Sequence, residues 1–432
     1  MSSIEIKSGR THSIVISGLA RRRAAERRFR FYGFASIFVG LVFLVLMFGN
    51  IVLHAGAAFL QTEIALEVSF DPGVLDPEGT HSSEALVDAD YNALLKKSLS
   101  LLFPNVVDRQ QKKSLTGLLS SGAQFELRKA VMANPQLAGR TQTMWLPASD
   151  STDMFAKGQV DRNVAESDRR LSDLQLQWLD KLKAEGRIEK RFNRTFFTAG
   201  DSREPELAGI WGALMGSMWT LVVTLCLSLP IGMATAIYLE EFAPRNAWTD
   251  IIEVNINNLA AVPSIVFGLL GLAVFINFFG MPRSSPLVGG VVLTLMTLPV
   301  IIIAGRSALK SVPPSIREAA LGIGASNMQT VFHHVLPLAI PGMLTGAIIG
   351  MARALGESAP LLMIGMVAFI VDIPNGITEP STVLPVQIYL WSDSPERGFV
   401  ERTSAAILVL LAFLILMNGT AVYLRKRFER RW

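Results

Sequence analysis

Long apolar stretches constrain this chain more than any other feature of its sequence. Of the 432 residues, 50% are hydrophobic and 18% are charged, so the charged residues must be kept apart from the apolar stretches. An apolar stretch of about 18 residues or more is a candidate for a membrane-spanning helix. We therefore predict an all-α membrane protein with six transmembrane helices. The six stretches lie at about residues 33–53, 209–239, 256–280, 286–304, 338–371 and 404–424.

Lys and Arg residues near the apolar stretches predict the orientation in the membrane. Residues 1–30 hold eight of them, and the tail 425–432 holds five. Cytoplasmic segments carry such an excess, so we expect residues 1–32 and 425–432 on the cytoplasmic side of a bacterial inner membrane. Six spans agree with that arrangement. Arg306 and Lys310 are interpreted as further positive anchors at the inner surface. The basic ends therefore require no nucleic acid as a partner, only membrane lipid.

The first apolar stretch has two possible interpretations. Ala55-Gly56-Ala57 resembles the small-residue site at which a signal peptide is cleaved. However, the apolar run before it has about 21 residues, whereas the apolar region of a signal peptide has about 7–15. We therefore favour an uncleaved transmembrane helix at residues 33–55, with a signal peptide as the alternative.

Residues 56–206, which we call the inserted domain, form a long polar block between the first two spans. The predicted orientation places this domain in the periplasm. The chain's one cysteine, Cys226, lies in the second span, so the domain must fold around its own core without a disulfide. Leucines at helical spacing predict helices near 94–102 and 171–182. Glycine and proline near 133–148 predict a loop, and no alternation is strong enough to predict strands. We expect a mainly helical domain.

Residues 305–337, which we call the elbow, connect two spans on the predicted cytoplasmic side. The part Arg317–Pro337 is polar and broken by glycines. We predict a first helix that ends at Gly322 or Gly324, since glycine adopts the left-handed geometry that ends helices. A second helix should run toward Leu336, and Pro337 should mark its junction with the next span. An ordinary interhelical loop is the alternative. Supporting signals are Pro313 and Pro314 in a first turn, Ser315 and Glu318 at capping-box spacing, and Ser326 as a second cap.

Two charged residues lie in the fifth apolar stretch. Arg353 and Glu357 are four residues apart, so they share one face of a helix. A charge inside a bilayer costs at least about 2.5–3.5 kcal/mol, so both should face the protein interior. Arginine binds phosphate through two parallel hydrogen bonds, which indicates either an anion path or a structural ion pair. The stretch 338–371 would be about 51 Å long as one helix, so we expect a break at Gly356 and Pro360.

A proline and a serine, Pro263 and Ser264, lie in the third apolar stretch. A proline there can kink the helix and free backbone groups toward a cavity. The alternative is a kink that only serves packing.

Three segments of the sequence resemble ABC-importer permeases. In the elbow, His334 stands where the family has an aliphatic residue, and the neighbouring Val335 is expected to make that apolar contact instead. The runs Asn258–Gly268 (NLAAVPSIVFG) and Ala352–Leu362 (ARALGESAPLL) resemble the phosphate-specific, PstA-type members. The resemblance covers residues 207–424, and the inserted domain has no counterpart in it. The elbow residues that carry the coupling motif are Glu318, Ala319, Ala320, Gly324, Leu336 and Pro337.

The resemblance implies a fold, partners and roles for these residues. The fold is that of type I ABC-importer permeases, with the membrane domain at 207–424. The function is half of an inorganic phosphate pathway, completed by a homologous permease subunit. A cytoplasmic ATPase dimer would bind ATP and act on the elbow, and a periplasmic protein would deliver phosphate. Arg353, Glu357 and Ser264 would line the pathway.

No residue of this chain is assigned to catalysis, to a cofactor or to a metal. The segment Gly305–Ser311 lacks the second glycine of a P-loop, and His333-His334 has no acidic or thiol neighbours. The alternatives are a permease for sulfate, molybdate or phosphonate, or a membrane sensor that detects a ligand with the inserted domain. A sensor needs an internal output domain, yet the longest internal segment has about 33 residues. An intramembrane enzyme is disfavoured because paired catalytic groups are absent.

Overall fold

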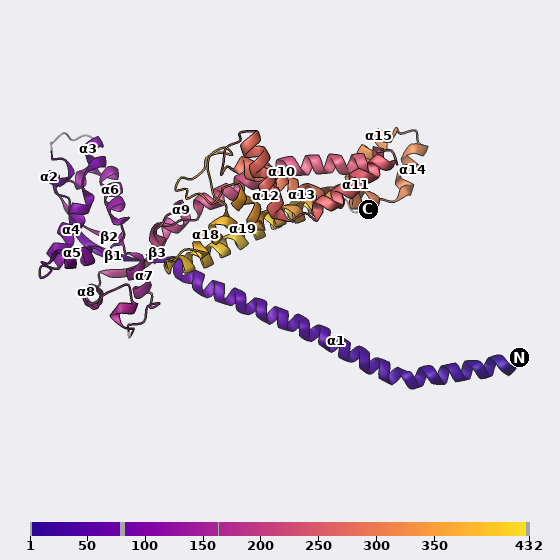
Figure 1. Cartoon of the computed structure of the whole chain (residues 1–432), viewed down its shortest axis with the longest axis horizontal. Helices are drawn as coiled ribbons and strands as arrows, with labels where there is room; N and C mark the ends of the chain where they lie inside the picture. The colour runs from indigo at the N-terminus through magenta and orange to yellow at the C-terminus, as the bar shows by residue number, and fades with distance from the viewer. Residues whose placement is uncertain (1, 78–82, 163, 429–432) are drawn as a thin grey trace. The chain divides into compact units, whose positions relative to one another are not determined.

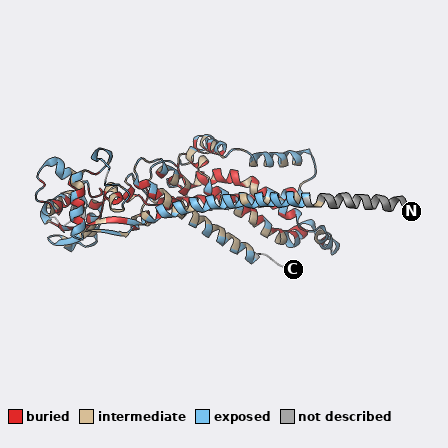
Figure 2. Cartoon of the chain, turned by 90° about the horizontal axis from the view of Figure 1, so that it is seen from below, coloured by how far each residue is buried: buried red, intermediate tan, exposed pale blue. Residues whose placement is uncertain are grey.

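The computed structural model describes residues 2–77, 83–162 and 164–428, so the part of the predicted basic tail at 429–432 lies outside the described residues. The chain divides into two units, one ending at Leu53 and the other beginning at His54. The first unit consists of helix α1 (Ser2–Ala58) up to that boundary. Side chains from 21 to 53 along α1 are mostly exposed (Figure 2). The helix covers the predicted first span.

Helices that are long and apolar enough to cross a membrane follow the predicted pattern. The described residues contain five of them, or six if one strongly bent pair counts as a span. This agrees with the prediction of six spans. The long helices of the membrane domain are α10 (Trp211–Ile237, continued by a π-helical turn Tyr238–Phe242), α13 (Pro286–Lys310), α16 (Leu336–Gly356) and α19 (Gly398–Phe428) (Figure 1).

The third span is broken rather than kinked, which corrects the prediction of a single span at 256–280. Helix α11 (Ala247–Ala260) and helix α12 (Ser264–Leu270, continued by a π-helical segment Gly271–Phe278) meet at 104°. Pro263 explains the break, because its ring has no N–H and disfavours a helical conformation of the residue before it.

The fifth span ends where glycine and proline predict. Helix α16 ends at Gly356, and the backbone of Glu357 is extended. A short helix α17 (Ala359–Met363), an irregular segment and α18 (Leu384–Ser392) follow. At its other end, α16 begins at Leu336 with Pro337 in its first turn, so the predicted junction lies at this proline, although the helix follows the elbow without a gap. A π-helical segment (Thr330–Val335) precedes it and replaces the regular hydrogen-bond pattern that proline would interrupt.

Helices α10 and α13 approach each other closely along a row of small residues. The row repeats every fourth residue of α10, so all its members lie on one face. A Cβ added to Gly290 of α13 would lie 2.5 Å from Val223, and the Thr224 hydroxyl donates to the Gly290 carbonyl at 3.3 Å. Inside a membrane the hydrophobic effect does not drive helices together. Rows of small residues favour their association there because they let the helix backbones pack tightly. The buried members are Thr220, Thr224, Ser228 and Gly232. Gly216, one turn earlier, instead approaches the carbonyl of Thr382.

The inserted domain contains an antiparallel sheet, which corrects the all-α prediction for this part of the chain. Strand β1 (Leu60–Ser69) lies between β2 (Thr141–Pro147) and β3 (Ile188–Phe192). In the register, Ile64 pairs with both Leu146 and Ile188. Most residues of β1 are buried on both faces of the sheet, so its sequence lacks the alternation of a half-exposed strand. Strand β2 replaces the second half of the loop predicted at 133–148.

Helices around this sheet contribute more residues to the inserted domain than its strands do. The leucines near 94–102 lie on α4 (Tyr91–Leu102), and those near 171–182 lie mostly on α8 (Asp173–Ala184). Their buried side chains join those of β1 and β2 in one hydrophobic core. Figure 2 shows these buried stretches between exposed ones. The other helices are α2 (Pro72–Leu75), α3 (Ser83–Asp88), α5 (Arg109–Thr116), α6 (Ala123–Ala133), α7 (Asp150–Ala156) and α9 (Arg194–Thr198).

Buried charges fasten the inserted domain to the first turns of α19. The Lys157 ammonium lies 2.7 Å from the Asp153 carboxylate and 2.9 Å from that of Glu401, and all three side chains are almost fully buried. The backbone N–H of Thr62 donates to Asp153 at 2.8 Å. Nearby, burial raises the pKa of Glu206 to about 7. The junction therefore holds the domain through charges that water does not reach.

Replacing Lys157 by methionine should destabilise this junction. Two buried carboxylates would lose their shared cation, and breaking a buried ion pair on one side costs about 3–5 kcal/mol. The thermal unfolding midpoint of the purified protein, followed by tryptophan fluorescence, should fall by several degrees. Lys183→Met, which changes an exposed lysine of α8, is the matched control. Equal midpoints for the two variants would contradict the role of the junction.

Candidate coupling and transport site

The elbow folds into two helical pieces that end close to the predicted positions. Helix α14 (Pro314–Gly322) ends at a predicted glycine, and Gly324 adopts a positive φ of 91°. Ser326 caps α15 (Asn327–Gln329) through a reciprocal capping box with Gln329, as the predicted second cap. The capping box predicted at Ser315 is wrong. Pro314 already begins the helix, so Ser315 lies inside it.

The residues of the coupling motif separate into an outer and an inner group. Glu318, Ala319 and Gly324 are exposed, whereas Ala320 is buried. Leu336 and Pro337 are half-buried at the start of α16. Val335 is fully buried and His334 is exposed, so the apolar contact is made by Val335, as expected from the departure at His334. Only the outer group is available to another molecule.

Large apolar side chains surround the outer group. Ile323, between the two helical pieces, is 82% exposed. An exposed apolar patch of this kind usually marks a site of interaction. We call these four residues the elbow surface: Leu321, Ile323, Met328 and Phe332.

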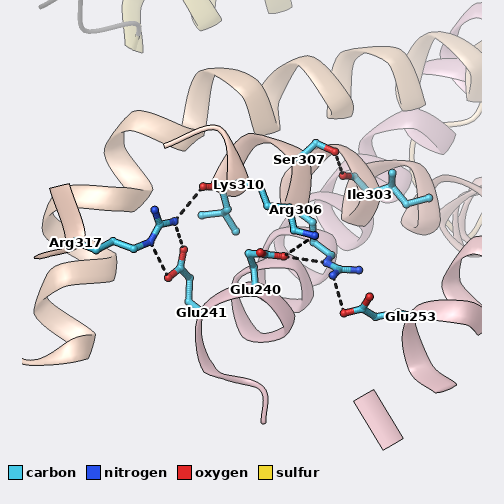
Figure 3. A network of polar contacts seen from close by, with 9 residues as sticks. Glu240, Glu241, Glu253, Ile303, Arg306, Ser307, Lys310 and Arg317 are labelled. Carbon is cyan, nitrogen blue, oxygen red and sulfur yellow. Dashed lines mark hydrogen bonds and ion pairs between the residues drawn. The ribbon is translucent and has the colours of Figure 1, made fainter. Parts of the chain in front are cut away.

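A forked ion pair holds the elbow to the end of α10. One guanidinium nitrogen of Arg317 lies 2.6 Å from a Glu241 oxygen, and Nε lies 3.3 Å from the other (Figure 3). The same guanidinium donates to the carbonyls of Leu309 at 3.0 Å and Val312 at 2.9 Å. Arg317 thus joins α14 both to the π-helical end of α10 and to the end of α13.

A second set of ion pairs begins at the adjacent carboxylate. Glu240 lies 3.3 Å from Nε of Arg306 and 3.6 Å from the Lys310 ammonium. Arg306 also binds Glu253 of α11 at 2.6 Å (Figure 3). Both cations were expected to be anchors at the membrane surface. That expectation stays a prediction, and the structure shows in addition that both cations belong to an intramolecular network.

The acidic half of this network is what sequence reasoning missed. Glu240 and Glu241 stand directly at the end of an apolar span, where a carboxylate is costly unless it is paired. Two carboxylates at the end of an apolar span therefore predict that arginines or lysines lie close to them. Which arginines they are depends on contacts between residues 53–76 positions apart, and local spacing does not show these.

Arg353 and Glu357 form an ion pair, one of the two alternatives left open by the sequence, at a surface of the chain. Nε of Arg353 lies 3.6 Å from the Glu357 carboxylate, and the two side chains are 45% and 22% exposed. Glu357 lies just beyond the end of α16, so the pair spans the break in the helix. The expectation that both charges face the protein interior concerns the protein assembled with its partner, so it stays a prediction. The face that carries them is open.

Ser264 is half-buried at the first position of α12. Among the described residues, no hydrogen bond joins it to Arg353 or Glu357. Helix α12 packs on α17, where a Cβ added to Gly268 would lie 2.7 Å from the Cα of Pro360. The runs 258–268 and 352–362, far apart in the sequence, therefore lie against each other.

Two family models match this chain. The one described as "Binding-protein-dependent transport system inner membrane component" matches residues 228–430, and a domain of unknown function, DUF3333, matches residues 17–166. The chain is 32% identical to a probable ABC transporter permease protein, YqgI, of Bacillus subtilis, over 53% of this chain and 83% of that protein.

Two relatives carry more specific names. The phosphate transport system permease protein PstA 1 of Mycobacterium tuberculosis is 32% identical over 52% of this chain and 72% of its own length. The phosphate transport system permease protein PstC of Haemophilus influenzae is 30% identical over 52% of this chain and 78% of its own length. The chain is thus similar to both kinds of permease protein.

A larger side chain at position 268 should push apart the runs 258–268 and 352–362. Gly268→Leu places a branched side chain against the Pro360 backbone, and overpacking of this kind costs about 1–3 kcal/mol. We expect a lower thermal midpoint for the detergent-solubilised protein. The control is Gly419→Leu on α19, where an added Cβ meets no atom within 4 Å. The packing argument fails if both variants unfold at the same temperature.

Proposed function

Because the chain belongs to the family of binding-protein-dependent transport system inner membrane components, we propose that it is the permease subunit of an ATP-driven inorganic phosphate importer. The observation that supports this substrate is the contact between the runs 258–268 and 352–362, since the second run contains the partly exposed Arg353. Relatives named as phosphate permeases support the same substrate.

The chain would form half of the pathway, and a homologous permease subunit would form the other half. A pathway between two subunits requires the residues that line it to be open on the face of each. Arg353 and Glu357 meet this requirement, since both are partly exposed in the single chain. The Arg353 guanidinium would donate parallel hydrogen bonds to a phosphate, while Glu357 competes for the same nitrogens. This competition would keep the anion from binding too tightly to be released.

The elbow would receive the ATPase. Glu318 is exposed beside the elbow surface, and neither has a partner within the described part of the chain that would cover it. A cytoplasmic dimer that closes on ATP would move α14, and hydrolysis would take place entirely on that dimer. A periplasmic phosphate-binding protein would deliver the anion to the other side.

This family and its apolar helices make the chain a multi-pass inner membrane protein. We propose that both termini and the elbow lie in the cytoplasm, because the Lys and Arg residues gather there. The inserted domain would then lie in the periplasm. Its sheet and its buried junction show a folded domain fixed to α19 rather than a flexible linker.

Replacing Arg353 by alanine should reduce phosphate uptake by about tenfold to a hundredfold, the range expected for losing charge-assisted hydrogen bonds. Uptake of labelled phosphate, sulfate and molybdate into vesicles containing the whole transporter is the measurement. Arg353→Lys keeps the charge without the planar fork and should restore only part of the uptake. A loss confined to sulfate or molybdate would assign the transporter to that anion instead.

Replacing Glu318 by tryptophan should uncouple the transporter. A bulky side chain would prevent close approach at the elbow, so phosphate uptake and transport-linked ATP hydrolysis should both fall. Membrane insertion, judged from the amount of protein in the membrane fraction, should be unchanged. Glu166→Trp, at an exposed site in the inserted domain, serves as the control. Normal uptake by the Glu318 variant would exclude the coupling role.

A further inference from the structure

The ion pairs at the end of α10 form a closed and neutral network. Three carboxylates, those of Glu240, Glu241 and Glu253, face three cations, those of Arg306, Lys310 and Arg317. Charges that are satisfied inside the chain are poor candidates for binding a charged ligand. Their effect is mechanical, since they join four separate helices (Figure 3).

The Arg317–Glu241 ion pair connects the network to the elbow. Glu241 is nearly buried, and Arg317, in the first turn of α14, contacts both of its carboxylate oxygens. Arg317 directly precedes Glu318, the residue proposed to meet the ATPase. A movement of α14 therefore acts first on the carboxylate at the end of α10. That end is π-helical, a conformation often found at functional sites.

The ion pairs of Arg306 connect the network to the broken third span. Arg306 holds Glu240 with one side of its guanidinium and Glu253 with the other. Glu253 lies in the middle of α11, which has no buried residue and packs on α13. With so little apolar burial, the position of α11 depends strongly on the Glu253–Arg306 contact.

Helix α11 leads directly into the proposed phosphate pathway. Its last residue, Ala260, precedes the break at Pro263, and α12 begins with Ser264 and packs on α17. A shift of α11 would therefore displace the start of α12, and α12 packs through Gly268 on α17, the short helix that follows Glu357.

We propose that Glu240 and Glu241 join the elbow to α11, so that Arg317 and Glu253 are positioning residues for transport. The inference rests on the proposed function, since the ATPase must act on the elbow. When α14 moves, the end of α10 passes the movement through Arg306 to Glu253 and α11. The broken third span then changes the pathway in step with the ATPase.

The test follows the elbow and α11 separately in the assembled transporter. In a Cys226→Ser background, spin labels at Ser315→Cys and Ile303→Cys report on α14, and labels at Asn257→Cys and Ile303→Cys report on α11. In the otherwise unchanged protein, both distances should change when ATP binds. With Glu253→Gln, the α14 distance should still change, the α11 distance should not, and phosphate uptake should fall about tenfold, within the range of typical coupling energies. ATP hydrolysis should persist.

The matched control is Asp250→Asn, which removes the same charge from an exposed site on the same helix. It should leave both distances and uptake unchanged. Arg317→Gln should likewise leave α14 responsive and α11 unresponsive. A Glu253→Gln transporter with normal uptake and a normal α11 response would overturn the link. If neither distance responds to ATP before any network residue is changed, the proposed action of the ATPase on the elbow fails instead.

Discussion

The close packing of α10 against α13 is the contact on which the rest of the membrane domain depends. Small residues on one face of α10 allow the two backbones to approach, and hydroxyls such as that of Thr224 reach carbonyls across the gap. This pair brings Glu240, in the π-helical end of α10, beside Arg306 of α13, and the neighbouring Glu241 beside Arg317 of α14. The ion pairs, the elbow and the broken third span are all attached to this scaffold.

Much of the membrane domain follows from the sequence because local chemistry decides it. Apolar length predicts the spans, and Gly356 and Gly322 end their helices where expected. The third span shows the limit of this reasoning. Pro263 was recognised as a disturbance, but whether a proline kinks a helix or breaks it by 104° depends on what the two halves pack against.

The features that were missed depend on contacts between distant parts of the chain. Strand β1 is covered on both faces, so its residues carry no alternation, and its partners lie about 80 and 130 positions further on. Glu253 meets Arg306 across 53 residues, and Lys157 meets Glu401 across 244. The open position of Arg353 was also not predictable, since a single sequence does not show which face of a helix a second subunit would cover.

The junction at Lys157 and Glu401 makes the inserted domain and the start of α19 one thermodynamic unit. A molecule that binds the inserted domain more tightly in one position of α19 than in another would shift the balance between those positions by that difference in affinity. The same free energy would act in reverse, so a step inside the membrane would alter how firmly the domain holds its ligand. Ligand binding to the inserted domain and movement of α19 would then influence each other in both directions, because the junction between them is rigid.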